Sequence, residues 1–494
     1  MRLSVRHIPL FLILTLLAPS VLTATTRLRS KKKPKDTKEK AVNLCEIDEP
    51  GAPLYCYCLP NDLRNATDAN CVIFGRLEPE VPIWNHFDSQ PYIEKLTLSV
   101  KSNGSFTHIP TTVLRQLKYI QVISIQYAVI SVIAERAFSN ISSVKQINLN
   151  RNQIQNLSRH AFENMKNLTD INLDNNRIAE IYRDVFVNLP NLKKLFINEN
   201  NLTTLHDKAF KHLNHLQELE MGRNGISVLT RDTFYGLKSL VRLDLRHNDL
   251  GMIGDKTFIE MRELVELDLA QNQIEFISGK ALDGMRNLRI LRLSDNKLVT
   301  LEPDFLAGAP NVYLLDLRDN HLKTMTFDNI KPIVVNLYNA STRIIVTGNN
   351  LTCDCRLAWI WGLKNETNNT RLKESLDELT CFLEENNATR QMIDNLRALP
   401  EREGLDLASE IPLNEVVEGK SGYMKHLFQL KVEELPCPDR QDLMASEQPS
   451  SRQEATLVGT SSGSMFPHSS AESVSLSYSA LFIVSFTNIA ILFT

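Results

Sequence analysis

The chain has 494 residues, more than one compact core usually holds, so we expect several domains or an elongated repeat array. Hydrophobic residues make up 43% and charged residues 23%, which excludes a disordered or collagen-like chain. The 55 Lys and Arg residues nearly balance the 58 Asp and Glu residues, so the net charge is −3 and no overall positive field favours nucleic acid as a partner.

The N-terminus predicts a secretory signal peptide over residues 1–24. Basic residues come first, an apolar run follows from Ile8 to Ala18, and small residues lead to Ala24. The run is too short to span a membrane, and a buried N-terminal helix is the alternative. Residues 25–44 form a basic leader with eight Lys and Arg residues between Arg27 and Lys40. We expect this leader to be disordered and solvated, although its charge could also attract heparan sulfate or an anionic membrane.

The C-terminus predicts a glycosylphosphatidylinositol (GPI) attachment signal over residues 470–494. The tail is apolar from Leu481 to Thr494, and no Lys or Arg follows Arg452. Ser469 is the expected attachment residue because Ser470 and Ala471 after it are small, and Ser462 is the alternative. A short transmembrane anchor or a merely apolar tail is also compatible with this pattern. The serine-rich residues 438–469 would form a flexible stalk.

An asparagine recurs every 24 residues through the middle of the chain. The eight positions are Asn152, Asn176, Asn200, Asn224, Asn248, Asn272, Asn296 and Asn320. An apolar frame precedes each one, as Leu240, Leu243 and Leu245 precede Asn248, which is the leucine-rich repeat signature. A degenerate repeat with Ala128 in place of the asparagine, and another that begins near Ile93, bring the total in residues 91–343 to about ten.

The repeat predicts an α/β solenoid with a curved parallel β-sheet on its concave face. Alternation around Leu243 and Leu245 makes a short strand whose leucines point inward, and strands of successive repeats stack in parallel. Each repeat asparagine can bond to backbone groups of neighbouring turns, so the asparagines are expected to form a ladder. A recurring apolar column should be structural: Phe138, Phe162, Phe186, Phe210, Phe234, Phe258, Leu282 and Leu306.

Two groups of four cysteines flank the repeats. Cys45, Cys56, Cys58 and Cys71 lie in residues 45–90, and Cys353, Cys355, Cys381 and Cys437 lie in residues 344–437. We expect disulfide-stapled caps that cover the open ends of the solenoid. Zinc binding is the alternative, but a single residue separates the close cysteines, where zinc sites usually have two to four. Spacing alone leaves three connectivities open in each group.

The segment from Asn349 to Trp359 resembles the opening of the C-terminal cysteine cap of extracellular leucine-rich repeat proteins. That resemblance implies that the first cysteine pairs with the third and the second with the fourth in each group. The implied disulfides are Cys45–Cys58, Cys56–Cys71, Cys353–Cys381 and Cys355–Cys437. The 55 residues between Cys381 and Cys437 exceed the usual cap loop and suggest an insertion.

Eleven Asn-x-Ser/Thr sequons agree with an extracellular glycoprotein. They are Asn65, Asn103, Asn140, Asn156, Asn167, Asn201, Asn339, Asn350, Asn365, Asn368 and Asn387. None lies in the central outward column of the strands, so glycans would leave the sheet free to bind.

The outward strand positions are the predicted binding surface. They interleave acids, arginines and one aromatic side chain, and the candidates are Phe196, Glu220, Asp244, Arg246, Asp268, Arg292, Asp316 and Arg318. Such a surface could pair with a complementary protein or, about a two-fold axis, with a second copy of itself. A solvated sheet face with mixed charge is the alternative. Neither Arg246 nor Arg318 is expected to support the core.

The repeats, caps and tail together resemble the GPI-linked leucine-rich repeat family of cell adhesion proteins. The resemblance covers Cys45 to Cys381 and includes the Leu54 to Cys58 segment. It implies a protein on the outer leaflet of the plasma membrane that mediates homophilic recognition between cells, in motor axon target recognition and muscle patterning. The alternatives are a heterophilic co-receptor and a secreted matrix protein. We expect no enzyme activity, cofactor or metal, since the sequence has no nucleophile elbow, no His-Glu-x-x-His motif and no phosphate-binding loop.

Overall fold

The computed structural model describes residues 42–60, 64–338, 341–385, 389–390, 415–417 and 420–437. The predicted signal peptide, most of the basic leader, the stalk and the GPI signal with Ser462 and Ser469 lie outside these residues. Asn339 and Asn387 also lie outside them. No helix among the described residues is long and apolar enough to cross a membrane.

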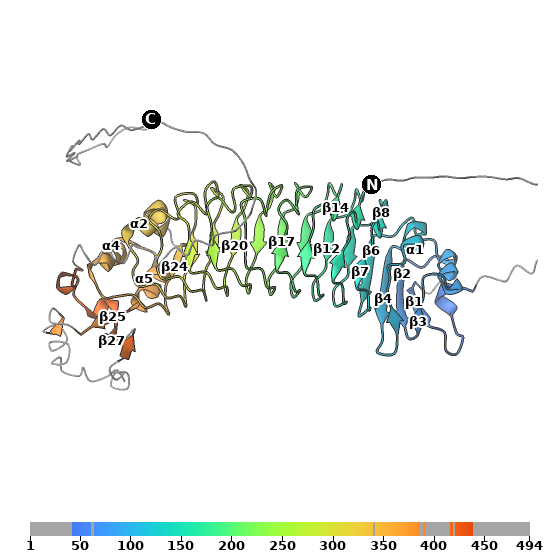
Figure 1. The fold of residues 1–494 in the computed structure, drawn as a ribbon, viewed down its shortest axis with the longest axis horizontal. Helices are drawn as coiled ribbons and strands as arrows, with labels where there is room; N and C mark the ends of the chain where they lie inside the picture. The colour runs from blue at the N-terminus through green and yellow to red at the C-terminus, as the bar shows by residue number, and fades with distance from the viewer. Residues whose placement is uncertain are drawn as a thin grey trace, which may run out of the picture. The chain divides into compact units, whose positions relative to one another are not determined.

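One 13-stranded sheet runs along the repeat array (Figure 1). In spatial order its strands are β1 (Leu54–Leu59), β2 (Asp68–Ile73), β4 (Lys95–Val100), β6 (Val122–Gln126), β9 (Gln146–Asn148), β12 (Asp170–Asn172), β15 (Lys194–Phe196), β17 (Glu218–Glu220), β18 (Arg242–Asp244), β20 (Glu266–Asp268), β22 (Ile290–Arg292), β23 (Leu314–Asp316) and β24 (Arg343–Ile345). Every neighbouring pair is parallel except β1 with β2. The 24-residue period sets the register, so that Leu219, Leu243 and Leu267 lie side by side. The predicted leucine-rich repeat solenoid is confirmed.

Shorter strands pair along the other sides of each turn. They are β3 (Arg76–Leu77) with β5 (Ser105–Phe106), β7 (Val132–Ile133) with β10 (Asn156–Leu157), β8 (Phe138–Ser139) with β11 (Phe162–Glu163) and β14 (Phe186–Val187), β13 (Glu180–Ile181) with β16 (Thr204–Leu205), and β19 (Met252–Ile253) with β21 (Phe276–Ile277). Parallel neighbours therefore hold successive turns together at several points around the coil.

The inward leucines and the phenylalanine column form one continuous core. Leu243 and Leu245 have no exposed surface, and a buried leucine contributes about 1.5–3 kcal/mol relative to an exposed one. The rings of Phe138 and Phe162 stack with centroids 5.2 Å apart, and Phe186 continues the stack. Beyond Phe258 the column continues with Leu282, and a small void of about 10 Å³ lies there against Phe305. The column is structural, as predicted.

The repeat asparagines form the expected ladder. Asn248 Oδ1 accepts from the Ile226 N–H at 3.0 Å. Its Nδ2 donates to the carbonyl of Met221 at 3.0 Å in the preceding turn and to that of Leu245 at 2.9 Å in its own turn. Asn349 bonds in the same way to Leu322, Leu317 and Val346. The ladder and β24 therefore extend across residue 344, where the sequence placed the start of the C-terminal cap.

The residue before each ladder asparagine has a left-handed backbone, which the sequence did not indicate. The φ angles in this column lie between 52° and 61° at non-glycine residues, and Gly348 has 73°. The non-glycine members are Arg151, Asn175, Glu199, Arg223, His247, Gln271, Asp295 and Asp319, and Tyr127 has the same conformation before Ala128. Four of these nine residues are Asn, Asp or His, which tolerate positive φ, whereas the Tyr, Arg, Glu and Gln residues adopt it because the repeated turn requires it.

The N-terminal cap continues the sheet. It contains η1 (Leu44–Glu46), β1, β2 and η2 (Pro82–Ser89), and α1 (Thr111–Gln116) follows in the first repeats. Cys45–Cys58 and Cys56–Cys71 are both disulfide-bonded. Leu44, which the sequence assigned to the leader, is fully buried. The cap therefore seals the core and adds two strands at the edge of the sheet.

The C-terminal cap is mostly helical. The last solenoid turn contains α2 (Phe327–Ile330), η3 (Lys331–Ile333) and α3 (Val334–Leu337) before β24. The elements of the cap are η4 (Cys355–Leu357), α4 (Trp359–Glu366), α5 (Thr370–Asp377), β25 (Thr380–Glu384), β26 (Glu415–Val417), β27 (Lys420–His426), η6 (Leu427–Gln429) and η7 (Val432–Glu434). Disulfides join Cys353 with Cys381 and Cys355 with Cys437. Trp359 Nε1 donates to the Met325 carbonyl at 2.9 Å, which ties the cap to the last turns of the solenoid.

Candidate functional site

The outward side chains of the 13-stranded sheet form the candidate binding surface, here called the sheet face. Its central row follows the strand register without a break: Tyr57, Asn70, Thr97, Ser124, Asn148, Asn172, Phe196, Glu220, Asp244, Asp268, Arg292, Asp316 and Ile345. Six of the eight predicted binding residues lie in this row. The other two, Arg246 and Arg318, lie two residues beyond the ends of β18 and β23.

Three predicted binding residues are recessed into the sheet face instead of being presented to solvent. Asp244 is 1%, Asp316 4% and Asp268 8% exposed. Each carboxylate accepts a hydrogen bond from the backbone N–H two residues later, at 3.0 Å for Asp244 and Asp268 and 3.2 Å for Asp316. The outward direction was predicted correctly, but these acids bond to their own backbone and neighbouring arginines cover them.

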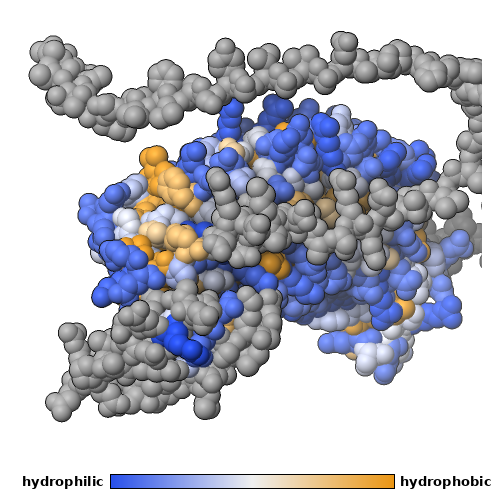
Figure 2. Space-filling model, turned by 60° about the vertical axis from the view of Figure 1, so that its left-hand side comes forward, coloured by the Kyte–Doolittle hydropathy of each residue, from blue (hydrophilic) through white to orange (hydrophobic). Residues whose placement is uncertain are grey.

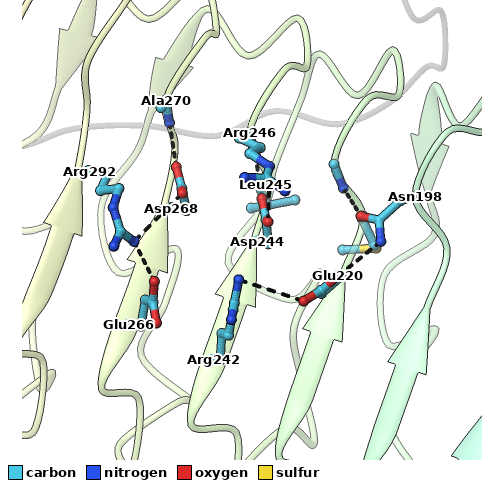
Figure 3. A network of polar contacts seen from close by, with 12 residues as sticks. Asn198, Glu220, Arg242, Asp244, Leu245, Arg246, Glu266, Asp268, Ala270 and Arg292 are labelled. Atoms are coloured by element: carbon cyan, nitrogen blue, oxygen red, sulfur yellow. Dashed lines mark hydrogen bonds and ion pairs between the residues drawn. The ribbon is translucent and has the colours of Figure 1, made fainter.

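The arginines project above these carboxylates (Figure 3). Arg246 Nε lies 3.3 Å from Asp244 Oδ2, and Arg318 forms two hydrogen bonds to Asp316, at 2.9 and 2.6 Å. Arg292 pairs with Glu266 on the adjacent strand and lies 3.7 Å from Asp268. The arginine side chains remain 54% exposed at Arg246, 46% at Arg318 and 30% at Arg292, so guanidinium donors dominate the accessible surface.

Arg246 and Arg318 also have a structural role, contrary to the expectation from the sequence. Asp244 Oδ2 is buried and lies at ion-pair distance from Arg246, without a hydrogen bond to any described group. Because Arg246 is the nearest cation, its removal would leave a buried carboxylate without a partner. Changing either arginine is therefore expected to affect stability as well as binding.

Arg242 belongs to the same surface, although the sequence did not single it out. It lies two positions before Asp244, and its guanidinium is 3.9 Å from Glu218 and 3.7 Å from Glu220. The alternation that turns Asp244 away from the core also turns this position outward, so the pattern could have identified it. Arg242, Arg246, Arg292 and Arg318 are called the arginine cluster below. A shallow hollow of about 370 Å³ lies among Arg242, Arg246 and Arg292.

The part of the sheet face before the arginine cluster is polar and bonded to itself. Phe196 is half-buried. Glu220 accepts from Asn198 Nδ2 at 3.0 Å, and Asn198 Oδ1 accepts from the Gly222 N–H at 2.8 Å. Burial raises the pKa of Asp174, while the hydrogen bond from the Asn198 backbone opposes the rise. Many of the polar side chains here therefore form hydrogen bonds with groups on neighbouring strands.

Replacing Asp244 by Asn should change the pH dependence of stability. Burial raises the pKa of Asp244 above its usual value of 3.8. Between the pKa of Asp244 in the unfolded chain and its higher pKa in the folded protein, the folded state binds more protons. The free energy of unfolding therefore falls as the pH rises through that interval. Asn keeps the acceptor for Arg246 N–H but cannot ionise. The free energy of unfolding of the variant minus that of the wild type, measured by urea unfolding, should therefore rise as the pH increases above 3.8, by about 1.4 kcal/mol for each unit of pKa shift. A difference that is constant or falls over this range would contradict the assignment.

The predicted glycosylation sites that the structure describes are all exposed. These nine asparagines are Asn65, Asn103, Asn140, Asn156, Asn167, Asn201, Asn350, Asn365 and Asn368. None lies in the central row of the sheet face. Glycans at these positions would therefore surround the sheet face without attaching to its centre.

On the face shown in Figure 2, the visible described residues are mostly hydrophilic, with several apolar patches among them. Among the described residues, no group of three or more His, Cys, Asp or Glu side chains is arranged to hold a metal ion. The geometry of the sheet face suits recognition of another macromolecule through hydrogen bonds and ion pairs.

Comparison with protein families agrees with the fold. The model described as "Leucine rich repeat" matches residues 96–154, 142–202, 190–250 and 239–298. The chain is a leucine-rich repeat protein. It is related to connectin of Drosophila melanogaster, with 44% identity over 61 residues, and this match covers 12% of the chain and 9% of that relative. A solved structure, the crystal structure of the TLR13-ssRNA13 complex, aligns with a TM-score of 0.41 and 20% identity, covering 62% of this chain and 50% of that chain.

Proposed function

We propose that this leucine-rich repeat protein is a GPI-anchored cell-surface adhesion protein that mediates homophilic recognition between cells through its solenoid. The match to connectin is the observation that carries the proposal. The implied biological setting is motor axon target recognition and muscle patterning. The function requires no catalytic residues, because an adhesion protein acts by binding.

Three further features support an extracellular location. All eight cysteines are in disulfides, which persist in oxidising compartments. The nine described sequons are exposed and therefore accessible to glycosylation. The apolar C-terminal tail after Ser469 fits removal during attachment of a GPI lipid.

Expression of the full chain on cells that do not normally aggregate tests the proposal. Expressing cells should cluster with one another and not with bare cells. Treatment with phosphatidylinositol-specific phospholipase C should release the chain and disperse the clusters. Clustering only with cells that display another protein would favour a heterophilic co-receptor, and secretion into the medium without phospholipase would favour a matrix protein.

A further inference from the structure

An acidic, aromatic patch on the N-terminal cap has no assigned role. Tyr57 is 63% and Phe74 47% exposed, and the rings of Tyr55 and Phe74 pack edge to face with centroids 5.7 Å apart. Tyr55 Oη donates to the Glu49 carbonyl at 2.7 Å, which places the backbone of Glu49 beside the Tyr55 ring, and Glu46 and Asp48 precede it in the same segment. We call Tyr55, Tyr57 and Phe74, together with Glu46, Asp48 and Glu49, the cap patch.

The carboxylates of the cap patch differ from those of the sheet face. Glu46, Asp48 and Glu49 are exposed, and none forms an ion pair with another residue in the described part of the chain. Asp244, Asp268 and Asp316 are covered and paired. Exposed carboxylates without an ion pair therefore lie beside exposed aromatic rings at one end of the sheet. Exposed guanidinium groups lie towards the other end, with the exposed Asp295 and Asp319 near them.

Both surfaces face the same way. Tyr57 occupies the central row of the sheet face on β1, the first strand, while Arg292 occupies it on β22. The sequence has no sequon between Asn201 and Asn339, so the turns that present the arginine cluster carry no N-glycan. A large partner could therefore reach both surfaces from one side.

The two surfaces are chemically complementary. A guanidinium group that already pairs with a recessed carboxylate retains donors for a second carboxylate, and its planar face can stack on a Tyr or Phe ring. Tyr and Arg are also the side chains most often found at the centre of protein interfaces. Two sheet faces in direct contact at their arginine clusters would instead place exposed cations against one another.

We propose that homophilic contact is made between the cap patch of one copy and the arginine cluster of the other. This inference rests on the homophilic function proposed above. Two copies in antiparallel orientation can form both contacts at once, because the patch and the cluster lie at separate places along one sheet. The two-fold axis then falls near β9 and β12, where the central row carries uncharged Asn148 and Asn172. Antiparallel copies also suit proteins anchored at their C-termini on two apposed cells.

Two charge-reversed variants test the contact in a two-colour cell aggregation assay with the full chain. The cap-reversed variant is Asp48→Lys/Glu49→Lys, and the face-reversed variant is Arg242→Glu, which leaves Arg246 in place beside the buried Asp244 carboxylate. Asp249→Lys/Glu275→Lys and Lys238→Glu/Arg286→Glu are matched controls, since these side chains are exposed and lie outside the central row and the arginine cluster. Antibody staining of intact cells measures surface display.

Each reversed variant should lose self-aggregation, with roughly a tenfold or greater loss of affinity between purified ectodomains, while both controls aggregate as the wild type does. A mixture of cap-reversed and face-reversed cells should aggregate again. In that mixture both contacts join opposite charges, so recovery also shows that both variants are folded.

Four results would overturn the inference. If the wild type clusters and the cap-reversed cells cluster equally well, the contact lies elsewhere and homophilic adhesion itself stands. If both reversed variants lose self-aggregation and the mixture fails to recover, charge pairing between cap and face is wrong. If the controls lose aggregation as much as the reversed variants, the effect is not specific to these surfaces. If the wild type does not cluster, both the proposed function and this contact are wrong.

Discussion

Asn248→Ala is expected to lower the free energy of unfolding by about 2 to 4 kcal/mol. The side chain is 4% exposed and bonds to the backbone of Ile226, Met221 and Leu245, which span two turns. Alanine leaves these buried groups without their partner, and no water reaches a corner that tight without opening it. Urea unfolding of the purified ectodomain, followed by circular dichroism, measures the loss.

Asp249→Ala is the matched control. Asp249 is the next residue, is exposed and belongs to the same turn, so its change should stay within about 0.5 kcal/mol of the wild type. Because each turn of a solenoid contacts mainly its neighbours, the Asn248 variant should open first in the turns around β18. Equal midpoints for the two variants would mean that the ladder contributes no net stability.

Removal of the Cys355–Cys437 disulfide should have a larger effect than removal of Cys353–Cys381. The two bridges close loops with sequence separations of 82 and 28 residues. Loop-closure entropy in the unfolded chain gives about 4.5 kcal/mol for the longer loop and about 3.6 kcal/mol for the shorter one. Paired Cys→Ser variants of the ectodomain, compared by urea unfolding, measure both losses.

The same variants also report on the role of the cap. Cys355 and Cys437 join the start of the cap to the end of the described chain, so their loss should expose the last turn of the core. Earlier proteolysis between Leu351 and Cys437 than in the Cys353→Ser/Cys381→Ser variant would support this expectation. A larger loss of stability on removing Cys353–Cys381 would show that native contacts, and not loop length, set the contribution of each bridge.

The repeat frame was predictable because every turn meets the same physical demand. A turn that must bury leucines on one side and satisfy its backbone at a corner needs the same residue types at the same spacing. Leu243, Leu245 and Asn248 therefore identify the strand and the ladder without any knowledge of the neighbouring chain. The phenylalanine column follows for the same reason, since its rings stack turn upon turn.

The burial and hydrogen bonding of the sheet-face residues were harder to predict from the sequence. The position of Asp244 between two inward leucines indicates an outward side chain, but it does not indicate that the side chain bonds to Arg246 N–H and is covered. The bond to Arg246 N–H is local, but the burial of Asp244 depends on neighbouring strands, such as β20 with Asp268, which meet Asp244 only in the folded chain. Likewise, the Tyr, Arg, Glu and Gln residues of the left-handed column adopt positive φ because the repeated turn requires it.

The sequence by itself determined the solenoid, its core, its ladder and the positions of the two cysteine groups, because these depend on local periodicity. Only the tertiary structure decided that the cap strands β1 and β2 join the same sheet, which brings Tyr57 into one row with Phe196 and Arg292. It also decided which charges are covered and which reach solvent. The exposure of a side chain depends on the side chains of neighbouring turns that pack around it. The sequence of a single turn therefore does not determine it.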